Sequence, residues 1–359
     1  MPNVNETLLD EFLRHAVYVE RFKAGQLQSL RAFLDELMAD VSSILGQRLS
    51  DVKTSGTVNT KRLQALLLDL EKISNDVSEK LRETVTQQMK DLAIYEHGWT
   101  LATLQATIPV IVDFTTVAPA QLWAAVNARP FEGREFQQWF KDYSIAQANR
   151  ITQQVRIGVI EGETIDQTMR RIRGTQAAGY KDGIIHGINR RGAEALVRTT
   201  VNHVVTMARQ ATFDSNTEVV AAVTWRSTLD GRTSEICQAR DGKVFPVDSG
   251  PRPPAHPNCR STIVPVVKTW KQLGIDLAEA PEGTRASLNG QVPASETYQT
   301  WLSRQPVAFQ NDVLGKTKGI LFRKGELQLD KFVDMGTGRA YTLEELRRKH
   351  PDVFKKAGL

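Results

Sequence analysis

Apolar residues recur every three or four positions over the first 95 residues, which predicts long amphipathic helices. Residues 50–57 interrupt this pattern with Ser, Thr, Asp and Gly and so predict a loop. The run after the loop is the longest in the chain: Leu63, Leu67, Leu70, Ile73, Val77, Leu81, Val85, Met89 and Leu92. It predicts a helix of about 32 residues, or about 48 Å. Such a helix either pairs with the helix before it or reaches a partner protein, and we favour pairing within the chain.

The pattern is irregular between residues 97 and 133, where Pro109, Pro119 and Pro130 interrupt it. Helical periodicity returns over residues 134–160 and again over residues 191–213. Between these two runs, the spacing of Thr164 and Gln167 is that of a capping box, which predicts a short helix ending at Arg173.

The character of the chain changes after Asn216. Residues 218–227, 243–245 and 262–264 are rich in β-branched and aromatic side chains and predict short strands, and two Asp-Gly dipeptides between them predict turns. In the tail, periodicity predicts helices over residues 295–304, 306–314 and 343–349. A second capping box, Thr342 with Glu345, opens the last of these helices.

These patterns predict an α+β protein that is mostly helical, with long N-terminal helices and a small β-containing C-terminal core module. We expect four regions. Residues 1–95 form a helical N-terminal arm, 96–215 a helical middle region, 216–268 a small β-rich module that contains the Cys and His candidates, and 269–359 a helical tail.

Charge is unevenly distributed along the chain. Lys and Arg number 46 against 41 Asp and Glu, a net charge of +5, and 41% of residues are hydrophobic, which argues against intrinsic disorder. The first 100 residues carry 12 basic and 15 acidic residues, so the remainder holds 34 against 26, or +8. This surplus is smaller than the basic stripe typical of a dedicated nucleic-acid-binding protein.

The lack of a signal-peptide pattern and the low number of cysteines predict an intracellular origin. Cys237 and Cys259 are the two cysteines of the chain, too few for a disulfide framework, which suits a reducing compartment. The first residues lack the basic and apolar regions of a signal peptide. The most apolar stretch, residues 108–114, is far shorter than the roughly 20 residues that cross a membrane. We expect a soluble protein without a membrane partner.

One constellation carries candidate chemistry: Cys237, followed about 20 residues later by His256 and Cys259 in a turn that contains proline. A His and a Cys three positions apart can face one metal ion, with Cys237 as a third ligand. Structural zinc requires four protein ligands, and Cys237, His256 and Cys259 supply three. Asp230 or Asp241 is the candidate for the fourth ligand. We favour buried thiols beside a hydrogen-bonded histidine and expect no cofactor, with a disulfide as a third alternative.

An enzyme is the first alternative function. The His256-Pro257-Asn258-Cys259 run after an Asp-Gly turn is similar to the histidine motif of HNH nucleases, but no second His or suitable acidic ligand follows it. The chain also lacks a Gly-rich phosphate loop and a G-x-S-x-G elbow. The sequence therefore predicts no enzymatic activity and assigns no catalytic residue.

Basic residues gather in the middle of the chain, and they are the candidates for contact with DNA phosphates: Arg170, Arg171, Arg173, Arg190 and Arg191. Acidic neighbours such as Glu161, Glu163 and Asp166 partly neutralise the group. We favour a solvated helix face over a DNA-binding surface, because charge runs generally face water.

The order and spacing of several short motifs resemble the phage head morphogenesis family that includes the Mu F-like and SPP1 gp7-like minor head proteins. The motifs are Arg198-Thr199-Thr200-Val201-Asn202, Ala208-Arg209, Trp225-Arg226-Ser227, Thr233, Cys237, Arg240-Asp241-Gly242-Lys243-Val244-Phe245 and His256-Pro257-Asn258-Cys259-Arg260-Ser261. The similarity extends over residues 100–346. Many family members have a Cys-x-x-Cys pair and a further Cys, whereas here Arg240 and Ser261 stand at two of those positions.

The resemblance implies a minor head protein of a tailed bacteriophage, a structural virion component that is assembled into the procapsid near the portal with a role in DNA packaging or ejection. Its implied partners are the portal protein, other capsid proteins and packaged double-stranded DNA. It implies a place in the capsid interior or at the portal vertex, and in the host cytoplasm during assembly. The alternatives are a metal-dependent nuclease or toxin-like enzyme, and a DNA-binding accessory virion protein.

Overall fold

The computed structural model describes residues 4–54, 57–130, 134–178, 182–184, 190–269, 272–273 and 283–359. The chain forms two compact units. Unit 1 comprises residues 1–19, 93–125 and 202–359, and unit 2 comprises residues 20–92 and 126–201. The predicted mostly helical α+β class is confirmed, because helices dominate and the sheets are small. The predicted division into four regions stays a prediction.

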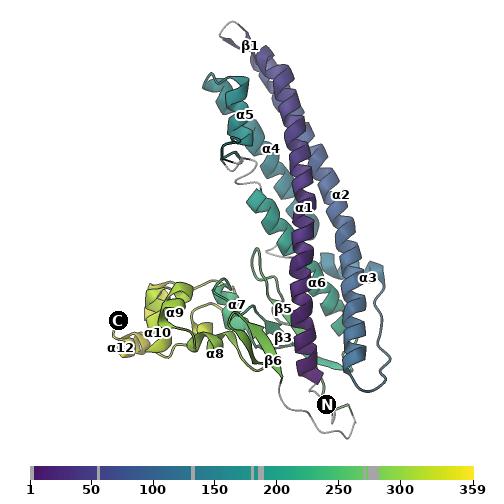
Figure 1. Cartoon of the computed structure of the whole chain (residues 1–359), viewed down its shortest axis with the longest axis vertical. Coiled ribbons are helices and arrows are strands. Elements are labelled where there is room, and N and C mark those ends of the chain that lie inside the picture. The colour runs from purple at the N-terminus through teal and green to yellow at the C-terminus, as the bar shows by residue number, and fades with distance from the viewer. Residues whose placement is uncertain are drawn as a thin grey trace. The chain divides into compact units, whose positions relative to one another are not determined.

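Unit 2 is built on a helical hairpin. Helix α1 (Val4–Val52) and helix α2 (Thr60–Thr107) are joined by the two-residue strands β1 (Lys53–Thr54) and β2 (Thr57–Val58), which pair antiparallel. Figure 1 shows the two helices side by side below this turn. Their buried residues share one core, which includes Leu37, Val41 and Leu45 from α1 and Leu66, Leu70 and Val77 from α2. The pairing within the chain that the periodicity favoured is thus present.

Two further helices complete the unit 2 core. Helix α4 (Phe136–Ile160) contributes Ile151, Val155 and Val159, and helix α5 (Ile165–Arg173) contributes Ile172. The predicted capping box is present, because the Gln167 backbone N–H donates to the Thr164 hydroxyl (3.2 Å) and the Thr164 N–H donates to the Gln167 side chain (2.7 Å). It satisfies two backbone donors that a helix start leaves unpaired.

Unit 1 contains a three-stranded antiparallel sheet in the order β4-β3-β5, formed by β3 (Val220–Arg226), β4 (Val244–Pro246) and β5 (Thr262–Val267). Helix α6 (Arg190–Asp214) precedes β3, and its final turns carry the buried Phe213 into the same core. The sheet contributes Val220, Val223, Ile263 and other apolar residues to that core. The predicted strands are therefore present, and β5 continues three residues beyond its predicted end.

The first turns of α1 belong to this sheet core. Val4, Leu8, Leu9 and Phe12 are buried in it. The Asn5 side chain also pairs with the backbone of β5, accepting from the Val267 N–H at 2.8 Å and donating to the Val267 carbonyl at 3.4 Å. Figure 1 shows the start of α1 beside β3 and β5. The N-terminal residues that we expected to form an arm therefore begin as a structural part of the β-containing module.

A buried polar network crosses the same core. Arg209 of α6 donates to Glu96 of α2 at 2.5 Å, and the second carboxylate oxygen of Glu96 accepts from His15 of α1 at 2.7 Å. The His15 ring stacks on Trp99 with a centroid distance of 3.7 Å. All three polar side chains are nearly inaccessible to solvent. These hydrogen bonds link α1, α2 and α6, and they fix the positions of the three helices along one another more specifically than apolar packing does.

The C-terminal part of unit 1 is a cluster of short helices around a separate core that includes Tyr298, Trp301 and Phe332. The elements, in chain order, are the hairpin β6 (Thr284–Ser287) and β7 (Gly290–Pro293), then α8 (Tyr298–Ser303), α9 (Val307–Leu314), α10 (Lys316–Arg323), the 3-10 turn η2 (Leu329–Lys331), α11 (Leu343–Lys349) and α12 (Pro351–Ala357). The second predicted capping box, Thr342 with Glu345, opens α11.

Two of the sequence expectations are wrong in the region after residue 95. Helix α2 continues to Thr107. The apolar periodicity does not reveal this continuation, because some inward positions carry polar side chains, such as His97, which is bonded to Thr212 at 2.8 Å. Helix α3 (Pro119–Ala128) begins at a proline that we counted as a breaker, since proline fits the first position of a helix. Among the described residues, no helix combines the length and apolar character needed to span a membrane.

We predict that Phe12→Ala lowers the free energy of unfolding of unit 1 by about 3–5 kcal/mol, the usual cost of truncating a buried phenylalanine. Phe12 is fully buried, meets Trp99 edge-on at 4.8 Å and lies under the Arg209 guanidinium. Urea unfolding followed by tryptophan fluorescence measures the change, with the exposed Val17→Ala as a control on the same helix. Equal stabilities of the two variants would show that the start of α1 does not support this core.

A second prediction concerns pH. Burial alone raises the pKa of Glu96, but the charge of Arg209 and the hydrogen bond from His15 outweigh it and hold the pKa below its ordinary value of 4.5. A lowered folded-state pKa stabilises the fold above about pH 4.5, and this stabilisation is lost as pH falls through the folded-state value. Glu96→Gln should therefore cost about 3–5 kcal/mol at neutral pH and progressively less in acid.

The measurement is urea unfolding of wild type and Glu96→Gln over a pH series. Glu36→Gln is the control, because Glu36 is exposed and pairs with an exposed Lys80. A stability difference that stays constant down to acid pH would contradict the role of the Glu96 carboxylate.

Candidate functional site

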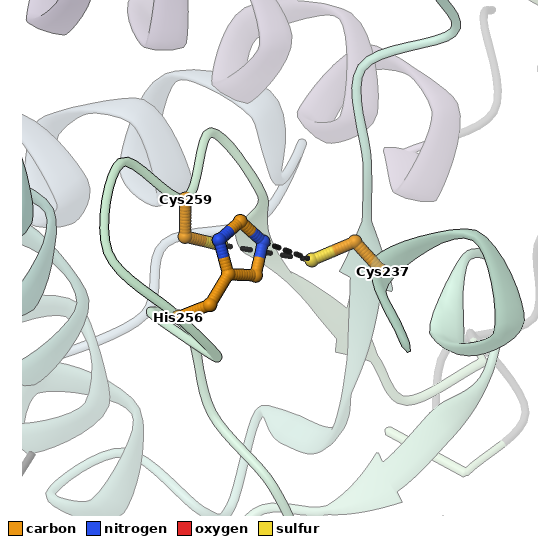
Figure 2. Close-up of side chains that lie close together, drawn as sticks. All are labelled: Cys237, His256 and Cys259. Atoms are coloured by element: carbon orange, nitrogen blue, oxygen red, sulfur yellow. Dashed lines mark hydrogen bonds between the residues drawn. The ribbon is translucent and has the colours of Figure 1, made fainter. Parts of the chain in front are cut away.

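The structure brings together the three chemically active candidates of the β-rich module. Cys237 lies on the short helix α7 (Glu235–Arg240), and His256 and Cys259 lie in the loop that leads into β5. Figure 2 shows the three side chains converging from these two segments. Both cysteines are buried, whereas His256 is partly exposed. We expected Cys237 in a turn-rich stretch, but it lies in a helix. The sequence did not reveal this helix, because six residues are too few to show a periodic pattern.

Hydrogen bonds define the orientation of the His256 ring. Its Nδ1 lies 2.8 Å from the carbonyl oxygen of Pro257, which can only accept, so Nδ1 carries the proton. The other ring nitrogen, Nε2, lies 2.7 Å from the Ser234 hydroxyl and 3.3 Å from the Cys237 sulfur. In the neutral ring, Nε2 is therefore an acceptor that faces the thiols.

The two sulfur atoms are 3.7 Å apart and share a hydrogen bond. This bond raises the pKa of the Cys237 thiol well above its ordinary value, and burial raises it further. The same bond, together with His256, lowers the pKa of Cys259. The physical cause is that one thiolate is stabilised by its neighbour's S–H, whereas two adjacent buried thiolates repel each other. The hydrogen bond between the sulfurs thus acts in opposite directions on the pKa values of the two thiols.

A buried ion pair holds the framework around this cluster. Asp241, directly after α7, accepts from the Ser227 N–H at 2.7 Å, the Tyr298 N–H at 2.8 Å and the Arg285 guanidinium at 3.0 and 3.2 Å. Arg285 also donates to the carbonyl of Ser227 at 2.8 Å. Both charged side chains are almost fully buried. Asp241 and Arg285 therefore join the end of β3, the end of α7, the β6 strand and the start of α8.

Several smaller contacts connect this framework to the thiols. The Ser227 hydroxyl donates to the Cys237 carbonyl at 2.9 Å and lies 3.0 Å from the Ser261 hydroxyl. Asn202 of α6 donates to the carbonyls of Cys259 (3.0 Å) and Ser261 (3.3 Å). The loop and the helix that carry the two cysteines are thus each fixed by side chains from other elements.

A partly buried edge of the site carries a second ion pair. Arg260 donates to both carboxylate oxygens of Asp230 at 2.7 and 2.8 Å, and the Tyr298 hydroxyl donates to the Asp230 carbonyl at 2.7 Å. Burial raises the pKa of Tyr298, with Asp230 adding to the shift. Asp230 and Asp241, which we considered as a speculative fourth metal ligand, are both engaged with arginines.

The basic candidates Arg170, Arg171 and Arg173 lie on α5 of unit 2, whereas the Cys-His-Cys cluster belongs to unit 1. Arg170 and Arg173 are exposed. Arg171 forms ion pairs with Glu161 and Glu163. Arg190 and Arg191 begin α6, and their side chains lie outside the described part of the chain. The solvated helix face that we favoured stays a prediction, and contact of this group with DNA stays its untested alternative.

Sequence reasoning missed the residues that organise the site. Asp241 was considered as part of a turn dipeptide, a family motif and a metal site, but not as the partner of a buried arginine, and Arg285 lay in a stretch without a predicted element. The sequence signal that indicates such a residue is a charge at a position where the apolar pattern predicts burial. Arg209 is an example, because it follows the buried Val204, Val205 and Ala208 on the same helix. Such a residue requires a buried partner.

We predict that breaking the Asp241–Arg285 pair from one side costs about 3–5 kcal/mol in the free energy of unfolding, because the other charge stays buried without its partner. Arg285→Met should destabilise in this way. Arg285→Met combined with Asp241→Asn should be less destabilising than Arg285→Met alone, since the amide oxygen of Asn still accepts from the backbone N–H groups of Ser227 and Tyr298.

Chemical denaturation of the two single variants and the double variant measures the coupling between the positions. Additive effects would show that Asp241 and Arg285 contribute independently.

Part of the chain matches a known protein family. Residues 149–264, about a third of the chain, match the family described as phage Mu protein F like protein. Neither the curated proteins nor the solved structures contain a significant match. The matched segment spans α4 to the start of β5 and includes Asn202, Ser227, Asp241 and the whole Cys-His-Cys cluster. The resemblance inferred from the motifs is confirmed over residues 149–264, which are similar to the phage Mu F-like family.

Proposed function

We propose that the protein is a non-enzymatic minor head protein of a tailed phage that is built into the procapsid near the portal and acts in DNA packaging or ejection. The observation that carries the proposal is the family match over residues 149–264. The family concerns phage head morphogenesis, and the attachment to the portal is the finer step that we add.

The use of the motif residues supports a structural role over a catalytic one. Asn202, Arg209, Ser227 and Asp241 all direct their polar groups to partners inside unit 1. An active site of the acid-base type instead keeps such groups directed at a substrate. These residues therefore fix the positions of α6, β3 and α7 relative to one another.

The surroundings of the Cys-His-Cys cluster support the same view. The cavity beside it has a volume of about 20 Å³, enough for one water molecule. Ligand pockets for small molecules usually measure about 300–1,000 Å³. Neither a nucleotide nor a peptide fits next to the thiols in this conformation.

The decisive experiment is assembly. The chain is co-expressed with the portal, scaffolding and major capsid proteins of the same phage, and procapsids are separated by sedimentation and analysed by mass spectrometry. We expect the protein in the procapsid fraction in few copies, and we expect its amount to fall sharply when the portal protein is omitted. Arg285→Met, destabilised in unit 1, serves as a variant in which incorporation should decline with folding.

Three results would contradict the proposal. The first is that the protein stays out of particles when all partners are present. The second is cleavage of DNA that is lost in His256→Ala, which indicates the nuclease alternative. The third is salt-sensitive retention on DNA without particle association, weakened by Arg170→Ala with Arg173→Ala, which indicates the DNA-binding alternative.

A further inference from the structure

The donor atoms of the Cys-His-Cys cluster are spaced as a tetrahedral metal ion spaces its ligands. Zinc binds sulfur at about 2.3 Å and nitrogen at about 2.0–2.1 Å, so tetrahedral angles place two sulfurs about 3.8 Å apart and a sulfur and a nitrogen about 3.6 Å apart. The Cys237 and Cys259 sulfurs are 3.7 Å apart, and Cys237 Sγ is 3.3 Å from His256 Nε2. All three ligand atoms lie within 4.8 Å of one another. These separations are close to those that three ligands of one tetrahedral ion adopt.

The second observation is the tautomer of His256. A metal-binding histidine commonly donates its remote N–H to a backbone carbonyl, which orients the ring and directs the lone pair at the metal. Here Nδ1 donates to the Pro257 carbonyl at 2.8 Å, and Nε2 faces the sulfurs. The Nε2 lone pair that accepts from the Ser234 hydroxyl at 2.7 Å therefore also lies next to the Cys237 sulfur.

The third observation is the space for a fourth ligand. The cavity of about 20 Å³ is lined by Ser234, Asn258 and Arg260 as well as by Cys237 and His256. It has room for one water molecule. Ser234 stands at the N-cap of α7, but its side chain makes no capping hydrogen bond, so its hydroxyl can rotate away from Nε2 without loss to the helix.

The charge of the occupied site also suits its surroundings. Two thiolates and one Zn²⁺ are neutral together, and a neutral group is less costly to bury than an unpaired charge. Both cysteines lie in an apolar cluster with Trp225, Ile236 and Val333. On binding, each thiol releases its proton to solvent and forms a bond to the metal.

We propose that Cys237, His256 and Cys259 bind one Zn²⁺ ion, with a water molecule from the adjoining cavity as the fourth ligand, and that the ion fastens α7 to the loop before β5. This goes beyond the proposed head function, which requires no metal. Because the adjoining cavity has room for one water molecule and not for a substrate, we assign the ion a structural role, with that water in place of a fourth protein ligand.

A disulfide is the competing state of the same two sulfurs. An S–S bond of about 2.05 Å would draw them together by about 1.6 Å and remove two ligands at once. Metal binding and oxidation are therefore mutually exclusive, and the experiment distinguishes them.

The test uses the full chain purified under reducing, oxygen-free conditions and then loaded with Co²⁺, a spectroscopic substitute for Zn²⁺. We expect one Co²⁺ per chain, visible d–d bands of a tetrahedral ion and a sulfur-to-cobalt charge-transfer band, all displaced by one equivalent of Zn²⁺. Because Cys237 and Cys259 are the two cysteines of the chain, the charge-transfer band reports on this site alone.

Ligand variants test the assignment. Cys259→Ser and His256→Gln should each weaken Zn²⁺ binding by more than about 100-fold, since even loss of an outer partner of a metal ligand costs 10–100-fold. The control is His350→Gln, a histidine between α11 and α12 far along the chain. Circular dichroism of each variant verifies folding, and Zn²⁺ should raise the melting temperature of wild type and His350→Gln but not of Cys259→Ser.

Three outcomes would overturn the proposal. They are the absence of a charge-transfer band in the folded, reduced protein, a Cys259→Ser variant that retains wild-type affinity, and two cysteines that alkylate in full while Zn²⁺ is present in excess. A disulfide found in protein that was kept reduced and oxygen-free would equally overturn it.

Discussion

The β-containing module depends on one buried carboxylate. Asp241 accepts hydrogen bonds from Ser227, Tyr298 and Arg285, which come from three other parts of the chain. Desolvating this charge is costly, and the cost is offset only when all its partners are in place. The ends of β3 and α7 and the starts of β6 and α8 must consequently reach their positions together. The position of Cys237, one turn before Asp241, follows from the same constraint.

Much of the fold was predictable where local signals are strong. Long runs of apolar residues at helical spacing indicated α1 and α2, and capping boxes fixed the starts of α5 and α11 to the residue. Helix α7 was not predictable, because six residues between Ser234 and Asp241 are too few for a periodicity. The continuation of α2 to Thr107 was hidden by His97, whose partner Thr212 is more than a hundred residues away.

The candidate site was predictable in its members but not in its setting. The spacing of Cys237, His256 and Cys259 indicated that the three could meet, and they do. What decides their chemistry comes from residues that carry no local signal. The Ser234 hydroxyl that shares Nε2, the Asn202 amide that holds the Cys259 loop and the Arg285 charge opposite Asp241 are all brought in by tertiary structure. A charged residue in an apolar pattern predicts that a buried partner exists, but the sequence does not identify that partner.

The pairing of Asn5 with Val267 has a consequence for synthesis. These residues lie 262 positions apart, yet they close the same core. At a translation rate of about 5–20 residues per second, the first helix leaves the ribosome about 10–50 s before its strand partner exists. During that interval Leu8 and Phe12 lack the strand against which they are later buried, so their apolar side chains stay in contact with solvent.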